Sequence, residues 1–181
     1  MQPNLLAGDF IISYKLPYGF RLASLMSDKI FVWKTPKRGE VFVFHLPKNQ
    51  DVKYVKRVIG IPGDTVEIKA DQLIVNGELA QYSAAENVHN YLMQKKEAVI
   101  GMEQDVYFMK KSEPSNFGPI LVTEGNVFVL GDNRDSSDDS RYWGLVSMNH
   151  IESKVFGIWF SLDVKSNDKG ALRRIRWSRI F

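Results

Sequence analysis

Short runs of apolar residues, separated by residues that favour turns, dominate the chain. The runs are four to six residues long, are rich in β-branched and aromatic side chains, and lie at 41–44, 65–68, 72–75, 106–109, 126–130 and 155–160. Glycine, proline, asparagine and aspartate cluster between them. Asn76-Gly77 follows one such run and is the dipeptide preferred in tight hairpin turns, whose two central positions need positive φ. The pattern predicts a mainly β fold that is rich in hairpins.

The stretch 80–123 departs from this pattern. It is more polar, and we expect a short helix near 85–96 followed by a loop at 111–119, where proline, serine, asparagine and glycine gather. An insertion into one core explains this better than a second independent domain. We therefore predict a β core formed by 1–79 and 124–181, with a smaller inserted α+β lobe at 80–123.

Composition removes several classes of chemistry. The 181 residues include no cysteine, which excludes disulfides, thiolate nucleophiles, iron–sulfur clusters and cysteine zinc sites. The three histidines, at 45, 89 and 150, are scattered and offer little material for a metal cage. A membrane helix needs roughly 18 consecutive apolar residues, and no run here approaches that length. We expect no metal, no cofactor and, for the chain as given, neither a membrane span nor a signal peptide.

Charge is concentrated at one end of the chain. Residues 165–181 hold six basic residues and one acidic residue, so the rest of the chain is slightly negative although the net charge is +3. A nucleic-acid protein usually spreads its basic residues over a folded face. A short basic tail with Trp177 and Phe181 is equally compatible with an anionic lipid surface or with a simple solvated tail.

Lys56 is the first candidate for chemistry. Side chains alternate between the two faces of a strand, so Tyr54, Lys56 and Val58 share one face while Val55 and Arg57 lie on the other. An apolar setting would lower the pKa of the Lys56 amine and make its neutral form available as a general base. An ordinary exposed lysine on a strand fits the same alternation.

The second candidate is the polar loop 131–144, which follows an apolar strand. Its interleaved aspartates and arginines can satisfy one another, which favours a salt-bridged scaffold, and the alternative is a solvated acidic loop. A calcium loop is excluded because Arg134 and Ser136 interrupt the alternating acidic positions. Glycine-rich phosphate loops, a Gly-x-Ser-x-Gly turn and His-Glu-x-x-His are absent from the sequence, and His45 lies in a predicted strand, so a Ser-His-Asp mechanism is not expected.

Taken together, four segments resemble bacterial type I signal peptidase, a membrane-anchored endopeptidase. Met1–Asp9 resembles the family's Ser-Met-x-Pro-Thr-Leu-x-x-Gly-Asp motif, with Asn4 in place of threonine. Arg38–Phe44 with Pro47 resembles its Arg-Gly-Asp-hydrophobic motif. The segment Tyr54–Asp64 is similar to the motif that carries the general-base lysine, and Gly131–Arg141 to Gly-Asp-Asn-Arg-Asp-x-Ser-x-Asp-Ser-Arg. The resemblance covers essentially the whole catalytic region in the family's order.

The resemblance implies a role for each matching residue. Lys56 would be the general base, Ser137 would orient its amine, and Asp139 would pair with Arg141 beneath the site. Arg57 and Asp132 would be scaffold partners. Four further positions would line the shallow pockets that accept small residues of the substrate: Met1, Leu5, Tyr54 and Val55. The reaction would be acyl transfer through a serine ester, without a cofactor.

The family's setting is implied in the same way. The substrates would be signal peptides of exported preproteins. The enzyme would be located at the bacterial inner membrane with its catalytic domain facing the periplasm, and it would touch lipid and not nucleic acid. Four aromatic residues could meet the membrane or simply pack in the core: Phe10, Phe31, Trp33 and Trp159.

The resemblance also shows one departure. In the family motif the nucleophilic serine immediately precedes the methionine that is Met1 here, so we expect the chain as given to lack its nucleophile and oxyanion donors and to be inactive alone. A start assigned one residue late, or a truncated product, explains this better than an inactive relative does. The alternatives are a non-catalytic protein that binds extended peptides or assists assembly, and a self-cleaving repressor-type Ser/Lys protein, for which no DNA-reading helix pair is visible.

Overall fold

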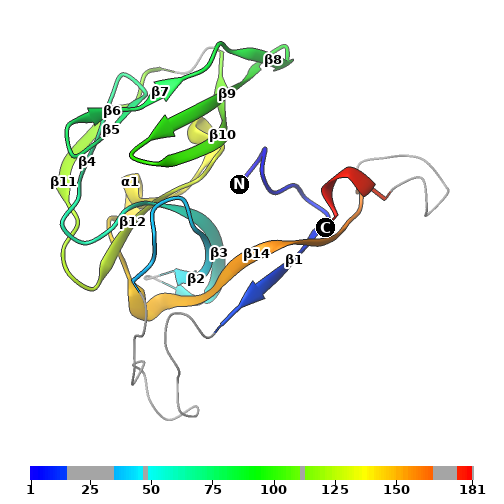
Figure 1. Ribbon diagram of the computed structural model, residues 1–181, viewed down its shortest axis with the longest axis horizontal. Helices are drawn as coiled ribbons and strands as arrows, with labels where there is room; N and C mark the ends of the chain where they lie inside the picture. The colour runs from blue at the N-terminus through cyan, green and yellow to red at the C-terminus, as the bar shows by residue number, and fades with distance from the viewer. Residues whose placement is uncertain (16–34, 47–48, 111–112, 165–174, 181) are drawn as a thin grey trace, which may run out of the picture.

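The computed structural model describes residues 1–15, 35–46, 49–110, 113–164 and 175–180, and its elements are almost all strands (Figure 1). These residues hold one short α-helix, α1 (Ser140–Trp143), and 3-10 turns at Arg134–Ser136, Met148–His150 and Trp177–Arg179. The strands are β1 (Asp9–Tyr14), β2 (Val41–Leu46), β3 (Asn49–Gly60), β4 (Thr65–Lys69), β5 (Gln72–Val75), β6 (Glu78–Leu79), β7 (Gln81–Tyr82), β8 (Glu86–His89), β9 (Leu92–Val99), β10 (Met102–Met109), β11 (Phe117–Leu121), β12 (Asn126–Leu130), β13 (Val146–Ser147) and β14 (Ile151–Ser161). The predicted mainly β fold is confirmed.

The largest sheet has six antiparallel strands in the order β1-β14-β2-β3-β12-β13. One face of its central strands packs on buried apolar side chains from β2, β3, β12 and β13: Phe42, Phe44, Val58, Val127, Val129 and Val146. Burial of these side chains, at about 1.5–3 kcal/mol each for the larger ones, fixes the register of β3. That register decides which face of the sheet Lys56 occupies.

A second sheet, in the order β11-β4-β5-β6, contains the hairpin predicted at Asn76-Gly77. Asn76 and Gly77 have φ of +53° and +80°, the left-handed values that a two-residue turn requires. The Asn76 side chain also donates to Asp64, which accepts hydrogen bonds from Arg38 in the turn that precedes β2. The Asn76-Gly77 signal predicted this turn correctly because the backbone conformation of a two-residue turn depends on the turn residues themselves.

The helix expected near 85–96 is wrong, because this stretch forms β8, the turn at 90–91 and most of β9. Strand β9 pairs with β10 at eight consecutive positions, from Leu92 with Met109 to Val99 with Met102. Together with β7 and β8 they make a third sheet. Intrinsic helix preference is weak and is outweighed by a hairpin that buries apolar side chains on one face.

The loop expected at 111–119 is corrected in its last residues, because β11 begins at Phe117 and pairs with β4. Gly118 has φ of +83° and the register shifts between Phe117 and Ile120, so this strand carries an irregularity. Pro119 is tolerated because β11 lies at the sheet edge, where a missing N–H is not needed. A buried cluster spans β3, β4, β5, β10 and β12, and includes Ile59, Val66, Leu73, Met102 and Phe128. The proposed division at 79/80 and 123/124 stays a prediction.

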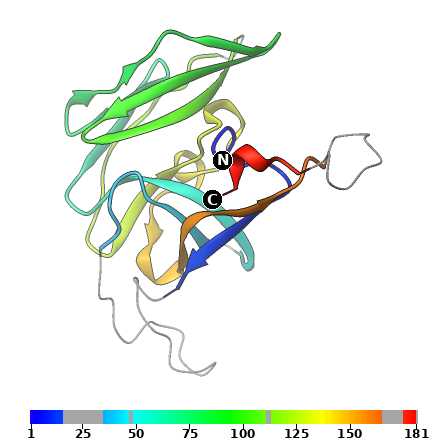
Figure 2. The same cartoon turned by 45° about the vertical axis from the view of Figure 1, so that its right-hand side comes forward.

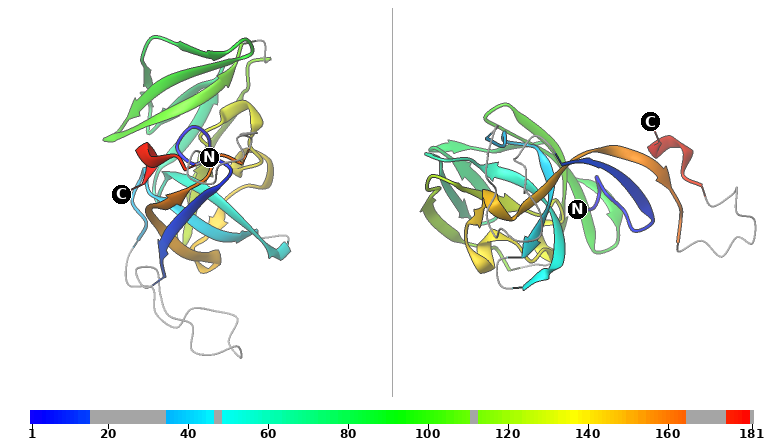
Figure 3. Two further views of the ribbon diagram at one scale, coloured as in Figure 1. Left: turned by 90° about the vertical axis from the view of Figure 1, so that its right-hand side faces the viewer. Right: turned by 90° about the horizontal axis from the view of Figure 1, so that it is seen from below.

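The N-terminal segment lies near the C-terminal 3-10 turn Trp177–Arg179 (Figure 1). The hairpin β9–β10 leans over the N-terminal segment, and β1 with β14 projects from the body as a two-stranded arm (Figures 2 and 3). Asp9, at the end of this arm that lies away from β2, is paired with Arg176 and Arg179, and Arg179 also donates to the carbonyl oxygen of Asn4. Part of the basic C-terminal segment is therefore folded against the first strand rather than solvated. Its residues 165–174 and Phe181, like Phe31 and Trp33, lie outside the described residues.

Among the residues that the structure describes, no helix is long and apolar enough to cross a bilayer.

Candidate active site

Strand β3 carries Tyr54 and Lys56 on one face, as the alternation predicts. Lys56 pairs with Phe42 of β2 in the sheet and is buried, with 7% of its surface exposed. Its Nζ donates to the Oγ of Ser137 at 2.6 Å and lies 5.5 Å from the centre of the Tyr54 ring. The Lys56 side chain is therefore buried, with its amine bonded to the Ser137 hydroxyl and the Tyr54 ring beside it.

Burial is the largest influence on Lys56 and lowers the pKa of its amine below the ordinary value. The carboxylates of Asp139, Asp138 and Asp132 act in the opposite sense, while the Arg141 guanidinium adds to the lowering. The net direction is downward, so more of the amine is neutral near pH 7 than for an exposed lysine. A neutral amine is what a general base requires.

Ser137 is placed by the loop that follows β12. It caps the 3-10 turn Arg134–Ser136, and its side chain lies against Gly131 at the end of that strand. A Cβ built on Gly131 would stand 2.1 Å from Ser137 Oγ and 3.3 Å from Lys56 Nζ. A glycine is therefore required at 131 for space, although the sequence suggested only a turn there.

Asp139 holds this loop in place from the interior of the protein. It is fully buried and accepts hydrogen bonds from the Gly131 N–H and from the Nε and Nη2 of Arg141, the last two at 2.8 and 3.0 Å. It also caps helix α1 by accepting the Arg141 N–H. The resemblance placed Asp139 and Arg141 together beneath the site, and the structure brings them together.

Arg57, on the opposite face of β3 from Lys56, pairs with Asp132 through its Nε and Nη2 at 2.9 and 2.8 Å. Its Nη1 donates to the carbonyl oxygen of Gly39. Asn4 completes the group by donating to both Asp132 and the carbonyl oxygen of Asp105. Asn4, in the position of the family's usual threonine, thus links the N-terminal segment to the loop that carries Ser137.

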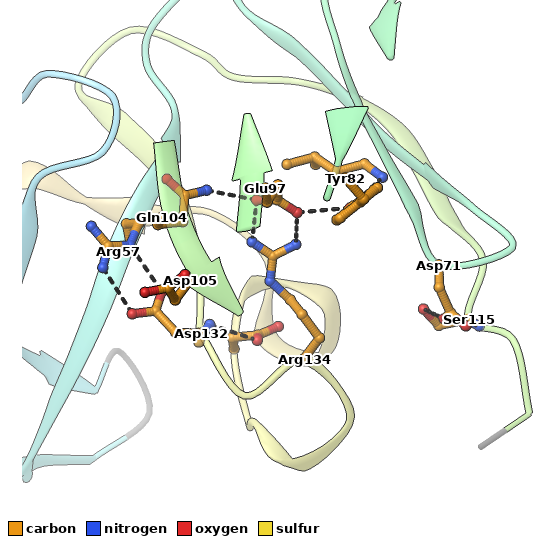
Figure 4. A network of polar contacts seen from close by, with 12 residues as sticks. Arg57, Asp71, Tyr82, Glu97, Gln104, Asp105, Ser115, Asp132 and Arg134 are labelled. Atoms are coloured by element: carbon orange, nitrogen blue, oxygen red, sulfur yellow. Dashed lines mark hydrogen bonds and ion pairs between the residues drawn. The ribbon is translucent and has the colours of Figure 1, made fainter. Parts of the chain in front are cut away.

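The sequence interpretation missed Glu97. It is fully buried on β9 and accepts two hydrogen bonds from the Arg134 guanidinium, as Figure 4 shows. Burial alone would raise the pKa of Glu97, but Arg134 holds it below its ordinary value, and the pKa of Arg134 is raised in turn. The sequence did contain a signal for this residue: in a strand, Glu97 lies on the same face as Val99. The helix predicted near 85–96 hid that alternation.

The four pocket positions are not gathered in one place. Tyr54 stands beside Lys56 and is braced by the rings of Phe44 and Trp143. The Met1 amino group is close enough to Lys56 and Asp132 to interact electrostatically with both. Leu5 instead lines a groove of about 500 Å³ with Gly39 and Phe156, and Val55 occupies the other face of β3.

The described residues contain no group of three or more histidine or acidic side chains arranged to hold a metal ion. Two of the four carboxylates of the loop 131–144, those of Asp132 and Asp139, are paired with arginines. The buried amine of Lys56, bonded to Ser137 and with its pKa lowered, is suited to proton transfer.

Comparisons with known proteins point to one family. The model of the family described as signal peptidase, peptidase S26, matches residues 1–160. A signal peptidase I of Pseudomonas aeruginosa is 36% identical over 181 aligned positions, covering 89% of this chain and 62% of that protein. One from Rickettsia typhi is 33% identical, covering all of this chain and 81% of that protein.

A solved structure of a signal peptidase I from Enterococcus faecalis V583 is 34% identical, with a TM-score of 0.44, covering 68% of this chain and 97% of the other. The chain spans 62% of the length of the Pseudomonas relatives. Since the family model matches most of its residues, the chain belongs to the signal peptidase family, peptidase S26.

Proposed function

We propose that this chain carries the catalytic region of an endopeptidase that removes signal peptides from exported preproteins by Ser/Lys acyl transfer. The observation that carries the proposal is the buried Lys56 amine, held 2.6 Å from the Ser137 hydroxyl. A neutral, oriented amine in an apolar setting is the base that such a mechanism needs. Family membership supplies the reaction class.

The nucleophile would be a serine joined directly to Met1, where the family motif has it. The Met1 amino group and Lys56 interact electrostatically, which supports a serine bonded to Met1 as the nucleophile that Lys56 would activate. Ser137 is occupied as the partner of Lys56. Ser13 lies on β1, three strands from β3, which is about 14 Å at ordinary strand spacing.

The proton path follows from this arrangement. Neutral Lys56 takes the proton of the serine hydroxyl as its oxygen attacks the scissile carbonyl carbon, and the resulting ammonium donates to the leaving amine. Water then hydrolyses the ester with Lys56 again acting as base. Ser137 accepts a hydrogen bond from the Lys56 amine, which has N–H groups in both its neutral and its protonated form, and this bond keeps Nζ in place through both steps. Tyr54 and Met1 would form the wall that admits only small side chains at the cleavage position.

Peptide cleavage tests the proposal. The substrate is a peptide with Ala-x-Ala before the scissile bond. We compare the 181-residue chain, the chain extended by the serine-containing upstream segment, and the extended chain with Lys56→Ala. We expect cleavage only by the extended chain with Lys56. Full activity after Lys56→Ala would refute the assignment of the base, and binding without cleavage by the extended chain would favour a peptide-binding protein.

A lipid surface is the second partner that we propose, with the catalytic region facing the periplasm at the inner membrane. On the β1–β14 arm, Phe10 and Trp159 are about half exposed and their rings contact each other, and Phe156 is 75% exposed. The Trp159 ring is amphipathic and of the kind enriched at membrane interfaces, and the two phenylalanines add exposed apolar surface beside it. Trp159→Ser with Phe156→Ser should weaken binding to anionic vesicles, whereas Tyr142→Ser, an exposed aromatic on α1, should not. Equal binding by both variants would argue against the lipid surface.

A further inference from the structure

The loop that positions Ser137 is attached to the third sheet as well as to its own strand. The N–H of Tyr107 on β10 donates to the carbonyl oxygen of Asp132 at 2.8 Å, and the N–H of Met109 donates to Asp135 at 2.6 Å. Tyr107 also forms an isolated bridge with Asn133. The segment 132–135 therefore runs alongside β10, with a parallel bridge at Tyr107 and Asn133.

The ion pair Glu97–Arg134 forms the buried end of this attachment. Both nitrogens Nη1 and Nη2 of Arg134 donate to Glu97, whose remaining acceptor positions are filled by the Tyr82 hydroxyl at 2.7 Å and the Gln104 amide at 2.6 Å. The side chains are 5% and 0% exposed. Four donors on one carboxylate leave it a single orientation, and a planar guanidinium bound at two points is equally fixed.

Arg134 transmits this geometry to Ser137. Its backbone begins the 3-10 turn that ends at Ser137, and its carbonyl oxygen accepts a hydrogen bond from Nη2 of Arg141. The Arg134 side chain is thus held by Glu97 on β9. The Arg134 backbone is held by Arg141, which is itself paired with Asp139. A buried ion pair is often no more stabilising than apolar residues of the same volume, so stability alone does not account for two charges at this point.

We propose that Glu97 and Arg134 are positioning residues for the Lys56–Ser137 pair: the third sheet fixes, through this two-point ion pair, where the Ser137 hydroxyl stands. The inference rests on the proposed function in one respect, that Lys56 is the base. It adds that the third sheet, through Glu97, determines the position of Ser137 and so how the base is held.

The test uses the 181-residue chain and needs no turnover. NMR titration of the Lys56 side chain reports its pKa, and thermal unfolding reports stability. In Glu97→Gln/Arg134→Met both charges are removed together, and an amide at 97 can still bond Tyr82 and Gln104. We expect a folded protein in which the Lys56 pKa has moved up toward that of an exposed lysine, because Ser137 moves and water enters.

Two further variants make the test decisive. Arg38→Met/Asp64→Asn removes another two-point ion pair outside the loop and should leave the Lys56 pKa unchanged. Arg134→Lys keeps the charge but cannot bond at two points, and should raise the Lys56 pKa even if the double variant fails to fold. An unchanged Lys56 pKa in the folded double variant, or in Arg134→Lys when that is the one that folds, overturns the proposal.

Catalysis separates this proposal from the proposed function. In the serine-extended chain, loss of the two-point pair should reduce kcat and leave KM nearly unchanged, because Tyr54 is not displaced. If the extended chain with the native pair is inactive, the proposed function fails while the NMR result still decides the positioning role.

Discussion

Gly131 lies so close to Ser137 that a Cβ on Gly131 would stand 2.1 Å from the Ser137 hydroxyl oxygen and 2.6 Å from its Cβ. The backbone at Gly131 does not have positive φ, so the requirement is for space and not for an unusual conformation. Its N–H is held by Asp139 at 3.0 Å, which prevents the strand end from moving away. Lys56, Ser137 and Gly131 thus form one closely packed contact.

Gly131→Ala should therefore displace Ser137 and break its hydrogen bond to Lys56. Overpacking of this kind costs about 1–3 kcal/mol of folding free energy. A displacement near 1 Å at a catalytic group reduces rates by roughly 100-fold, which we expect for kcat of the serine-extended chain. Ser136→Ala, at the exposed neighbouring position, is the control. Wild-type kcat in Gly131→Ala would show that Ser137 does not hold Lys56 during catalysis.

Asp138 and Asp139 are adjacent, and only Asp139 is buried and paired with Arg141. The contribution of that pair to stability can therefore be tested with Asp138 as the control. Asp139→Asn leaves Arg141 buried without its counter-charge, which should reduce the free energy of unfolding by about 3 kcal/mol. Asp138→Asn changes an exposed carboxylate that accepts one hydrogen bond from Tyr54 and should cost less than about 0.5 kcal/mol. Urea unfolding of both variants measures the difference. Equal losses would mean that the Asp139–Arg141 pair does not support the loop.

Local rules account for most of what the sequence predicted correctly. The apolar runs became β2, β4, β5, β12, and parts of β10 and β14, and the Asn76-Gly77 turn has the expected backbone. The alternation on β3 placed Lys56 opposite Arg57. The contact between Lys56 and Ser137 joins residues 81 positions apart, and it was predicted only through the family resemblance, because strand patterns do not specify which loop reaches which strand.

The failures have a physical pattern as well. Strand β9 carries Lys95, Lys96 and Glu97 in succession, which looks like the surface of a helix, yet Glu97 is buried because Arg134 neutralises it from a loop 37 residues away. Pro119 suggested a loop and is accommodated at a sheet edge. In both cases the tertiary position of the residue, beside a distant counter-charge for Glu97 and at a sheet edge for Pro119, overrides the local preference.

The burial of Lys56 should also lower the stability of the folded protein. Its pKa is lower when folded than when unfolded, so between those two pKa values the unfolded chain binds more protons and stability rises with pH. At pH values below the pKa of Lys56 in the folded protein, the folded protein carries the full cost of burying the ammonium group. We expect Lys56→Met to be more stable than the native chain at pH 6–7, with the difference shrinking toward pH 10. Native stability equal to that of the variant at all pH values would contradict the burial cost.

The pH dependence of cleavage provides the most direct test of the base. Only neutral Lys56 can accept the serine proton, so kcat/KM of the serine-extended chain should fall as pH drops below the Lys56 pKa and level off above it. Asp138 raises this pKa by its negative charge, and Asp138→Asn should therefore move the acid limb of the profile to lower pH. Glu103→Gln, which removes an exposed carboxylate paired with Lys96 on the β9–β10 hairpin, should leave the limb in place. A limb that moves to higher pH in Asp138→Asn, or that moves equally in both variants, would assign the titration to a group other than Lys56.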